Sequence, residues 1–594
     1  MMFVWDTRDL NQEQEDAIRA PGSIFLVACP GSGKTRALTY KIAYELSRLD
    51  SQRKRVIAIT YTNRAAEEIQ ERIELLGVDI SQLWIGTIHS FCLEWILRPY
   101  SIYHDRLKNG FGVISPHDSD AALDEICRAQ GGHVGLYDRG HYFSSAGLVL
   151  SGPLHKHNLI ADVLARYHSW LEENRLLDFE LILKCALELI SDRPQIAKLL
   201  SSIFAYVLVD EYQDTKQIQY AILAAILRAG EKQLHTFIVG DPNQAIYGTL
   251  GGYPIEPGAF ADITGLELDE RELSSNYRSS ARIVEYFEHF KLYDNAIEAV
   301  GPNRDIESVI SLDSTTTKDG LLDEIARLIA QSVEVDHIPQ QEICVLAPQW
   351  AMLAALTRRL VAALPQYEFD GPGMVPFARD MENFWYKMSR IALTSATPNM
   401  YVKRLRWAGE VISELSHAGV PISEITAKAL LRISNEFTCQ QTDGLQYLKE
   451  YFDMMLAWLG IDKTDYPTLA EHYVAFFESS HARIAKIAEQ GAESIREIAT
   501  FRKVFSERSG IKISTIHGVK GGEFDVVIAF GMLQGMVPNF NDPDQIGSAK
   551  KLMYVTCSRA RKHLHIIAEA ERPRGRYGSY QPTQVLIDVE FNYS

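Results

Sequence analysis

The sequence has few cysteines, and none of them is paired with another at short spacing. Its 594 residues contain seven, and each stands alone in its segment: Cys29, Cys92, Cys127, Cys185, Cys344, Cys439 and Cys557. A zinc ribbon or a cysteine-ligated cluster needs closely spaced cysteines, so both are unsupported, and the scattered pattern fits a reducing compartment. We therefore expect a cytoplasmic protein.

Long apolar runs are also missing. No uninterrupted apolar stretch approaches the roughly 18 residues that cross a bilayer. The N-terminal segment MMFVWDTRDL has no basic region followed by an apolar core, which a secretory signal would need. We expect no membrane association.

Positive charge is in deficit, because 60 Lys and Arg stand against 77 Asp and Glu, for a formal net charge of −17. This balance excludes a wholly basic protein that coats nucleic acid. It leaves room for an enzyme whose local basic groove lies on an acidic body. With 46% hydrophobic and 23% charged residues the chain is globular, and its length predicts roughly four folding units.

Seven short apolar runs predict strands that are buried on both faces of parallel sheets. They fall into two groups: 23–28, 55–60, 205–210 and 236–241, then 342–348, 525–530 and 563–568. Two groups separated by helical patterns predict an α/β protein with two domains. Residues 101–165 and 385–508 interrupt the groups, and we predict them to be mainly helical insertions. His155 and His157 have no third ligand in pattern and are expected in a solvated loop.

A glycine-rich loop follows the first predicted strand directly. The segment Ala28–Thr35 ends in GSGKT, which fits a phosphate-binding loop that opens a helix. Glycines let backbone N–H groups turn toward phosphate oxygens. Lys34 is suited to the β- and γ-phosphates of ATP and Thr35 to Mg²⁺. The candidate nucleotide-binding residues of this loop are Gly31, Ser32, Gly33, Lys34, Thr35 and Arg36.

The predicted strand that ends in VLVDE supplies two carboxylates. Asp210 is suited to hold Mg²⁺ together with Thr35, and Glu211 is suited to polarise water. These two motifs alone predict nucleotide hydrolysis and leave kinases, transporters, GTPases and motors open.

Further motifs follow in a fixed order. They are LNQEQ (10–14), AITYTNRAAEEI (58–69), GTIHSF (86–91), LLDFELIL (176–183), DEYQDT (210–215), GDPNQAIYG (240–248), LSSNYRSS (273–280), ISTIHGVKGGEFD (513–525) and LMYVTCSRAR (552–561). In this order and spacing the chain resembles the UvrD/Rep/PcrA-like helicases of superfamily 1A, from residue 10 to residue 561.

The resemblance implies two RecA-like P-loop domains with ATP between them and 3′→5′ translocation on DNA. It implies a first domain at 1–100 and 166–265 with an insertion at 101–165, and a second at 266–384 and 509–594 with an insertion at 385–508. Gln14 and Tyr277 would lie at the adenine, and Glu523 at the ribose. Glu211 would be the catalytic base and Gln244 would sense the γ-phosphate. Arg278 and Arg559 would reach that phosphate from the second domain, where an arginine is worth about 10³–10⁵ in rate.

The candidate DNA contacts are less specific. They are Thr60, Tyr61, Thr62, Asn63, Thr87, His89 and His517. Hydroxyl, amide and imidazole groups bind phosphate, and Tyr61 is suited to stack on a base. Polar groups of these types also cap loops, so both interpretations stay open. The expected ligand is single-stranded DNA or duplex DNA with a single-stranded tail.

The chain departs from the family pattern at several positions. Thr249-Leu250-Gly251-Gly252 stands where the family has Trp-Arg-Gly-Ala, so a base-stacking tryptophan is replaced. This departure and the compact insertions resemble helicases that work beside a separate nuclease, such as the helicase subunit of Gabija-type anti-phage systems and its OLD-family (TOPRIM) nuclease. The alternative to an autonomous helicase is therefore a nucleotide- and DNA-sensing regulatory subunit of a nuclease.

Overall fold

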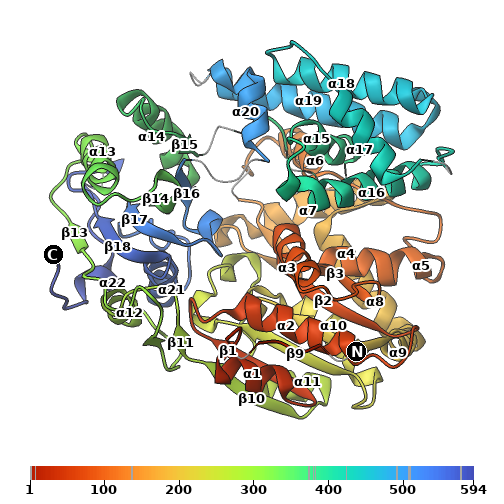
Figure 1. Ribbon diagram of the computed structural model, residues 1–594, viewed down its shortest axis with the longest axis horizontal. Coiled ribbons are helices and arrows are strands. Elements are labelled where there is room, and N and C mark those ends of the chain that lie inside the picture. Colours follow the sequence, from red (N-terminus) through yellow and green to blue (C-terminus); the bar gives the residue numbers. More distant parts are fainter. Residues whose placement is uncertain are drawn as a thin grey trace.

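The computed structural model describes residues 3–6, 8–135, 138–371, 375–378, 380, 383–422, 425–489, 493–505, 510–575 and 578–594. Two sheets of six parallel strands organise the chain (Figure 1). No helix among the described residues is long and apolar enough to cross a membrane.

The first sheet has the strand order β10-β1-β9-β8-β2-β3. Its strands are β1 (Ser23–Ala28), β2 (Arg55–Thr60), β3 (Leu83–Thr87), β8 (Phe204–Val209), β9 (His235–Gly240) and β10 (Leu268–Leu273). Phe25 faces one apolar cluster and Ile24 and Leu26 face another, so β1 is buried on both faces. This is the burial that a near-continuous apolar strand predicts.

The second sheet has the order β13-β18-β17-β14-β16-β15. Its strands are β13 (Ile310–Asp313), β14 (Ile343–Ala347), β15 (Phe369–Asp370), β16 (Ile511–Thr515), β17 (Phe524–Phe530) and β18 (Ala560–Ile567). Cys344 and Leu346 pack into one cluster and Val345 into the other, so β14 is also covered on both faces. The predicted α/β class with two parallel sheets is confirmed.

Helices cover both sheets. Around the first sheet they are α1 (Gln12–Arg19), α2 (Lys34–Ser47), α3 (Asn63–Leu75), α4 (Ile88–Phe91), α5 (Arg98–Tyr100), α8 (Phe179–Asp192), α9 (Pro194–Ile203), α10 (Gln217–Ala229) and α11 (Pro257–Thr264). Around the second they are α12 (Ala281–Glu288), α13 (Leu321–Ala330), α14 (Trp350–Ala363), α21 (Gln545–Cys557) and α22 (Gln584–Ile587). A two-stranded parallel pair of β11 (Ser275–Asn276) and β12 (Glu298–Ala299) lies between them in sequence.

The first insertion contains helices and strands. Helices α6 (Pro116–Ala129) and α7 (His157–Glu173) pack on each other, and β5 (His141–Ser144) and β6 (Gly147–Leu150) form an antiparallel hairpin. The short strands β4 (Gly112–Val113) and β7 (Leu176–Leu177) pair in parallel. The apolar side chains of this insertion join the same cluster as one face of the first sheet, so insertion and sheet share a core.

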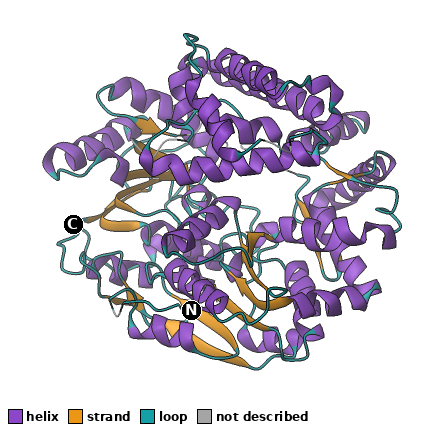
Figure 2. Cartoon of the chain, turned by 45° about the vertical axis from the view of Figure 1, so that its right-hand side comes forward, coloured by secondary structure: helices purple, strands orange, loops and turns teal. Residues whose placement is uncertain are grey.

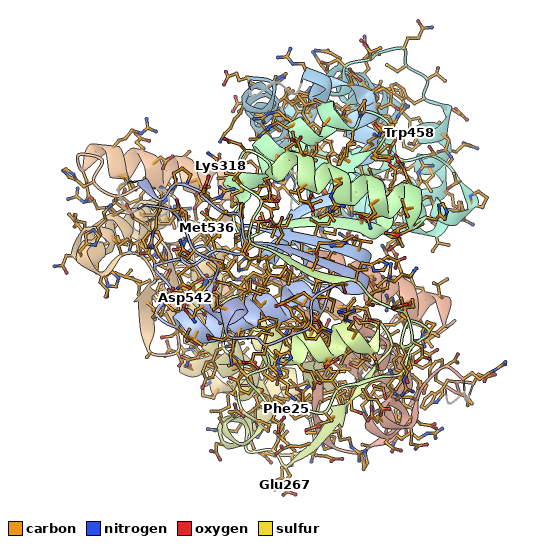
Figure 3. All side chains as sticks on the ribbon, turned by 90° about the vertical axis from the view of Figure 1, so that its left-hand side faces the viewer. Phe25, Glu267, Lys318, Trp458, Met536 and Asp542 are labelled. Carbon is orange, nitrogen blue, oxygen red and sulfur yellow. The ribbon has the colours of Figure 1, made fainter. Side chains whose placement is uncertain are left out.

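The second insertion is helical in its described residues. It consists of α15 (Phe384–Ala392), α16 (Tyr401–His417), α17 (Ala427–Glu436), α18 (Gly444–Leu459), α19 (Pro467–Glu489) and α20 (Ile498–Lys503), around a core of its own. Figure 2 shows this body as helices beside the two groups of strands, and Figure 3 labels Trp458 in it and Phe25 in the first sheet at the opposite end. Arg390 pairs with Glu67 on α3 and Glu410 on α16, so an almost buried charge fixes the body to the first domain.

The predicted domain division remains a prediction, but two of its boundaries can be compared with the observed strands and helices. Strand β10 follows residue 265 and pairs in register with β1, Leu26 opposite Arg271, so the first sheet extends beyond that boundary. Helix α7 runs across the boundary at 165. The boundary between 508 and 509 lies outside the described residues.

Candidate functional site: the facing ends of two parallel sheets

The loop between β1 and α2 has the shape that a phosphate site requires. Gly31 and Gly33 have φ of +70° and +79°, which favours glycine. A Cβ at Gly33 would meet Gln14 Nε2 at 2.6 Å. No side chain caps α2, which begins at Lys34. Its first N–H groups are therefore oriented to receive an anion, with the positive end of the helix dipole behind them.

The linker between the two sheets lies directly on this loop. Asn276 Nδ2 donates to Pro30 O at 2.6 Å, and Tyr277 N donates to Gly31 O at 3.0 Å. A Cβ at Gly31 would lie 2.6 Å from Arg278 Cβ. The segment that carries Tyr277 and Arg278 is thus fixed to the loop by one side-chain and one backbone hydrogen bond.

The two residues predicted at the adenine lie near one another. Gln14 is buried, and its Nε2 donates to Ser32 O at 2.8 Å. Asn11 caps α1 in a capping box with Gln14, and its Nδ2 donates to the Tyr277 hydroxyl at 2.9 Å. Arg36, the last predicted loop residue, donates to Asp9 O at 3.1 Å. Tyr277 remains 40% exposed, so its ring is available to a planar ligand.

The carboxylates lie at the end of β8, opposite the loop. Lys34 Nζ is 3.6 Å from Glu211 Oε2. Burial opposes ionisation of Glu211, but Lys34 and Lys520 overcome it and lower its pKa. Burial, and then the charge of Glu211, raise the pKa of Asp210. Thr35 begins the helix beside Lys34. The Asp210 carboxylate and the Thr35 hydroxyl fit a Mg²⁺ ion, whose charge would stabilise ionised Asp210.

Two arginines reach the same region, Arg278 from the linker after β11 and Arg559 from the residue before β18. Arg559 Nη2 donates to Gln244 Oε1 at 2.8 Å, and Gln244 Nε2 donates to Asp241 Oδ2 at 2.7 Å. Arg278 Nε donates to Glu523 Oε2 at 2.8 Å. Burial lowers the pKa of Arg559 to about 9, with Arg278 as the second cause. The predicted nucleotide residues are therefore gathered where the carboxyl end of the first sheet faces the amino ends of β17 and β18 in the second.

A row of aromatic rings lies next to Gln244. Tyr61 stacks on Tyr247 with ring centroids 5.1 Å apart, and Tyr247 contacts the His517 ring at 5.5 Å. Lys520 Nζ is 5.2 Å from the Tyr247 ring centroid. Tyr61 is 42% exposed. Tyr247 and Lys520 are absent from the predicted DNA contacts, although they lie in the motifs GDPNQAIYG and ISTIHGVKGGEFD. The sequence signal for Tyr247 was an aromatic residue three positions after Gln244.

The other predicted DNA residues differ in accessibility. Asn63 is exposed, whereas Thr60 is buried and donates to Thr62 O at 3.0 Å. Thr62 and Thr87 cap α3 and α4, so the capping interpretation is confirmed for these two hydroxyls.

The two histidines of the set are partly exposed. His89 packs edge-on against Phe179, and burial lowers its pKa to about 4. His517 Nε2 lies 3.3 Å from Ile246 O. His89 Nε2 is buried without a hydrogen-bond partner, so this nitrogen does not reach solvent in this arrangement.

Two parallel sheets with a glycine loop on one and arginines on the other define a two-domain P-loop protein. A family model for the UvrD/REP helicase N-terminal domain matches residues 10–140 and 144–254, and one for the UvrD-like helicase C-terminal domain matches residues 464–571. These segments together cover more than half of the chain. The chain belongs to the UvrD/Rep/PcrA-like helicases of superfamily 1A.

Curated relatives agree with this assignment. The chain is 29% identical over 298 residues to the ATP-dependent DNA helicase PcrA of Staphylococcus epidermidis, and 29% identical over 295 residues to that of Staphylococcus aureus. The first alignment covers 47% of this chain and 39% of the relative, and the second 46% and 39%. The chain thus spans about two fifths of the length of the relatives that it matches.

The ion pair between Lys520 and Asp214 gives a testable pH dependence. Lys520 Nζ donates to Asp214 Oδ2 at 2.5 Å across the two sheets. Burial raises the pKa of Asp214 from 3.8 to about 6, although Lys520 opposes the rise. Asp214 therefore binds its proton more tightly in the folded chain than in the unfolded chain. The stability that this proton binding contributes is fully present below pH 3.8 and is lost as the pH rises through about 6. In Lys520→Met we expect a still higher pKa and a loss of up to about 3–5 kcal/mol above pH 6.

Thermal unfolding at about pH 4 and about pH 8 measures this effect, because the loss in the variant should be larger at pH 8, where Asp214 is ionised, than at pH 4, where Lys520 faces only the ionised Glu211. Lys108→Met is the control, since Lys108 pairs with Asp105 at 2.9 Å on the exposed surface. Equal destabilisation by Lys520→Met at both pH values would contradict the assignment.

Proposed function

We propose that the protein is an ATP-dependent DNA helicase or translocase of the cytoplasm that moves 3′→5′ on single-stranded DNA. The observation that carries this proposal is the hydrogen bond between Arg559 and Gln244, which joins the two halves of the nucleotide site. The 3′→5′ direction comes from the resemblance to the UvrD/Rep/PcrA-like family. The relatives in Staphylococcus are named ATP-dependent DNA helicases.

The residues of the loop are suited to bind the triphosphate. The N–H groups at the start of α2 and the Lys34 ammonium would contact its oxygens, and Thr35 and Asp210 would hold Mg²⁺. Mg²⁺ bound there would neutralise charge on the β- and γ-phosphate oxygens. Gln14 and Tyr277 would enclose the adenine, and Glu523 would contact the ribose.

Hydrolysis requires a base and positive charge on the opposite side. Glu211 is held ionised by Lys34 and Lys520, so it would orient water and accept its proton. Arg278 and Arg559 would stabilise the charge on the transferred phosphoryl group. Because Arg559 precedes β18 of the second sheet, catalysis would depend on the distance between the sheets.

Movement on DNA would follow from the same contacts. Gln244 accepts from Arg559, and Tyr247 donates through its hydroxyl to His517 O at 3.2 Å. The segment that contains both residues therefore also contributes Tyr247 to the row of rings, where it contacts Tyr61 and His517. A change in the position of Arg559 would therefore move the surface on which we place the bases. Stacking there is independent of sequence, which suits a motor.

The ATPase activity is tested by substituting residues on both sides of the nucleotide site, Lys34 and Glu211 on the side of the first sheet and Arg559 on the side of the second. We expect Lys34→Ala to lose ATP binding, and Glu211→Gln to bind ATP but not turn it over. We expect Arg559→Ala to lower kcat by about 10³–10⁵, the value of an arginine that contacts the transferred phosphoryl group. Arg166→Ala is the control, because Arg166 lies exposed on α7 in a surface ion pair. Steady-state hydrolysis with single-stranded DNA is the measurement. Equal hydrolysis with and without DNA would contradict translocation.

The aromatic row is tested through affinity for single-stranded DNA. Tyr61→Ala should weaken binding of a labelled oligothymidine by about 1–3 kcal/mol, the value of one stacked base. Fluorescence anisotropy in the presence of a non-hydrolysable ATP analogue measures this. Tyr103→Ala is the matched control, since Tyr103 is 59% exposed in the first insertion and away from the row. Affinity unchanged by Tyr61→Ala would remove Tyr61 from the proposed DNA surface.

A second candidate is a nucleotide- and DNA-sensing regulatory subunit of an OLD-family (TOPRIM) nuclease in an anti-phage system. The segment 248–252 favours it, because Thr249 stands where the family has a stacking tryptophan and the neighbouring Leu250 is exposed. A weaker hold on DNA would leave ATP and DNA occupancy as signals with little unwinding.

Strand displacement separates the two candidates. If the chain is an autonomous helicase, it should unwind a 3′-tailed duplex with ATP and leave a 5′-tailed duplex intact. DNA-stimulated ATP hydrolysis without displacement, together with co-purification of a TOPRIM nuclease encoded next to it, would favour the regulatory subunit. Displacement from the 5′-tailed duplex alone would contradict the proposed direction.

A further inference from the structure

Three residues near the first insertion form a cluster that the nucleotide site does not use. They are His141 at the start of β5, His168 on α7 and Asp178 at the start of α8. One ligand atom from each residue, a ring nitrogen or a carboxylate oxygen, lies within 4.8 Å of the other two. Helix, hairpin and first-domain helix therefore converge on one point.

Both histidines have an unused nitrogen at this point. His141 Nε2 and His168 Nε2 are buried without a hydrogen-bond partner. An unsatisfied buried polar atom costs about 1–3 kcal/mol. The other nitrogen of His141, Nδ1, lies 3.0 Å from Arg139 O. A carbonyl only accepts, so Nδ1 carries the hydrogen and Nε2 presents its lone pair. Metal-binding histidines are oriented by this type of contact.

The surrounding contacts hold the ligands in place. Arg139, whose carbonyl orients His141, is buried and pairs with Asp124 on α6 at 2.9 Å. Asp178 caps α8 and accepts from Leu181 N at 2.8 Å through Oδ1. The His168 ring stacks on Phe143 at 5.9 Å between centroids. Each of the three side chains thus has a neighbour that restricts its rotation.

The donor atoms also fit a cation site. A neutral imidazole is the form that binds metal. Two imidazole nitrogens and one carboxylate oxygen are the donor set of a borderline ion such as Zn²⁺, with water completing the tetrahedron.

We propose that His141, His168 and Asp178 bind one divalent transition-metal ion of the Zn²⁺ type. Ligand bonds of about 2.0–2.2 Å place tetrahedral ligand atoms roughly 3.3 Å apart. The required contraction is at most roughly 1.5 Å from the observed separation. An ion bound there would tie the hairpin β5–β6 to α7 and α8. Tyr142 of that hairpin lies against Gly251, where a Cβ would meet its ring at 2.8 Å.

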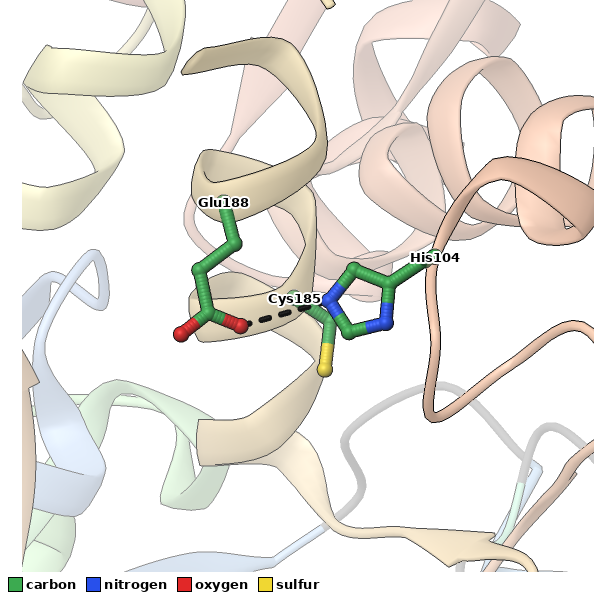
Figure 4. Close-up of side chains that lie close together, drawn as sticks. All are labelled: His104, Cys185 and Glu188. Atoms are coloured by element: carbon green, nitrogen blue, oxygen red, sulfur yellow. Dashed lines mark hydrogen bonds and ion pairs between the residues drawn. The ribbon is translucent and has the colours of Figure 1, made fainter. Parts of the chain in front are cut away.

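A second cluster on α8 is satisfied by its own contacts. His104, Cys185 and Glu188 also lie within 4.8 Å of one another (Figure 4). His104 Nδ1 accepts from Arg106 N at 3.3 Å, so Nε2 carries the hydrogen and donates to Glu188 at 3.3 Å. Burial raises the pKa of the Cys185 thiol to about 12, and a protonated thiol is a poor ligand. This cluster serves as an internal control.

Metal content and affinity test the proposal without any activity assay. Full-length protein is stripped with EDTA, dialysed against Zn²⁺ and analysed by elemental mass spectrometry. We expect one Zn²⁺ per chain, and a visible absorption band when Co²⁺ replaces it. His141→Ala and His168→Ala should lose the ion. Asp178→Asn keeps a helix-capping side chain and should weaken binding at least tenfold. His104→Ala and exposed His155→Ala should bind like the wild type.

Thermal unfolding provides a second readout. Saturating Zn²⁺ should raise the Tm of the wild type and of His104→Ala, but not that of Asp178→Asn, because only a ligand of the folded state stabilises it. Absence of Zn²⁺ uptake by the wild type would overturn the proposal. Uptake that persists unchanged in all three ligand variants would do the same, since the ion would then be bound elsewhere.

Discussion

The hydrogen bond from Arg559 to Gln244 joins the amino end of β18 in the second sheet to the carboxyl end of β9 in the first. Arg559 is almost fully buried, and a guanidinium in such a place costs several kcal/mol unless acceptors and opposite charges surround it. Its acceptors include Val555 O, and Glu211 and Asp241 face it from the first sheet. The facing ends are thus held together by the attraction between Arg559 and the carboxylates of Glu211 and Asp241. An anion that enters between the ends meets hydrogen-bond donors that are already in place. The same arrangement makes the separation of the sheets sensitive to what they bind.

The position of the second sheet relative to the loop is set over a very short stretch of chain. Asn276 donates to Pro30 O, and its own Oδ1 accepts from Arg278 N at 3.0 Å. One buried amide therefore fixes both the loop and the residue that carries the guanidinium. This explains why Gly31 must lack a side chain, since Arg278 Cβ occupies the space. The contact between the linker and the glycine loop depends on the consecutive residues Asn276, Tyr277 and Arg278. It depends less on the packing of the distant insertions.

The central strands and the loop were predictable from sequence because their signals are local. A strand buried on both faces is apolar throughout, so β1, β8, β9, β14 and β17 were found within a residue or two of their observed bounds. The edge strand β10 has the sequence LDEREL and was missed, because an edge needs polar residues. Contacts between distant segments gave no signal either. Tyr61, Tyr247 and His517 meet only in the folded chain, and the spacing of His141, His168 and Asp178 matches no short metal motif.

The segment 241–252 connects all of these features. At its start Asp241 accepts from Gln244, and Gln244 O accepts from Lys520 at 2.7 Å. Three residues later Tyr247 carries the ring row, and at its end Gly251 rests on the hairpin beside the histidine cluster. If the hairpin β5–β6 could move, it would move together with Gly251 when Gln244 is displaced. If the hairpin is held in place, a displacement of Gln244 moves Tyr247 instead. A metal ion that ties β5 to α7 and α8 would therefore give the nucleotide site a firm support against which to move the surface that we assign to DNA.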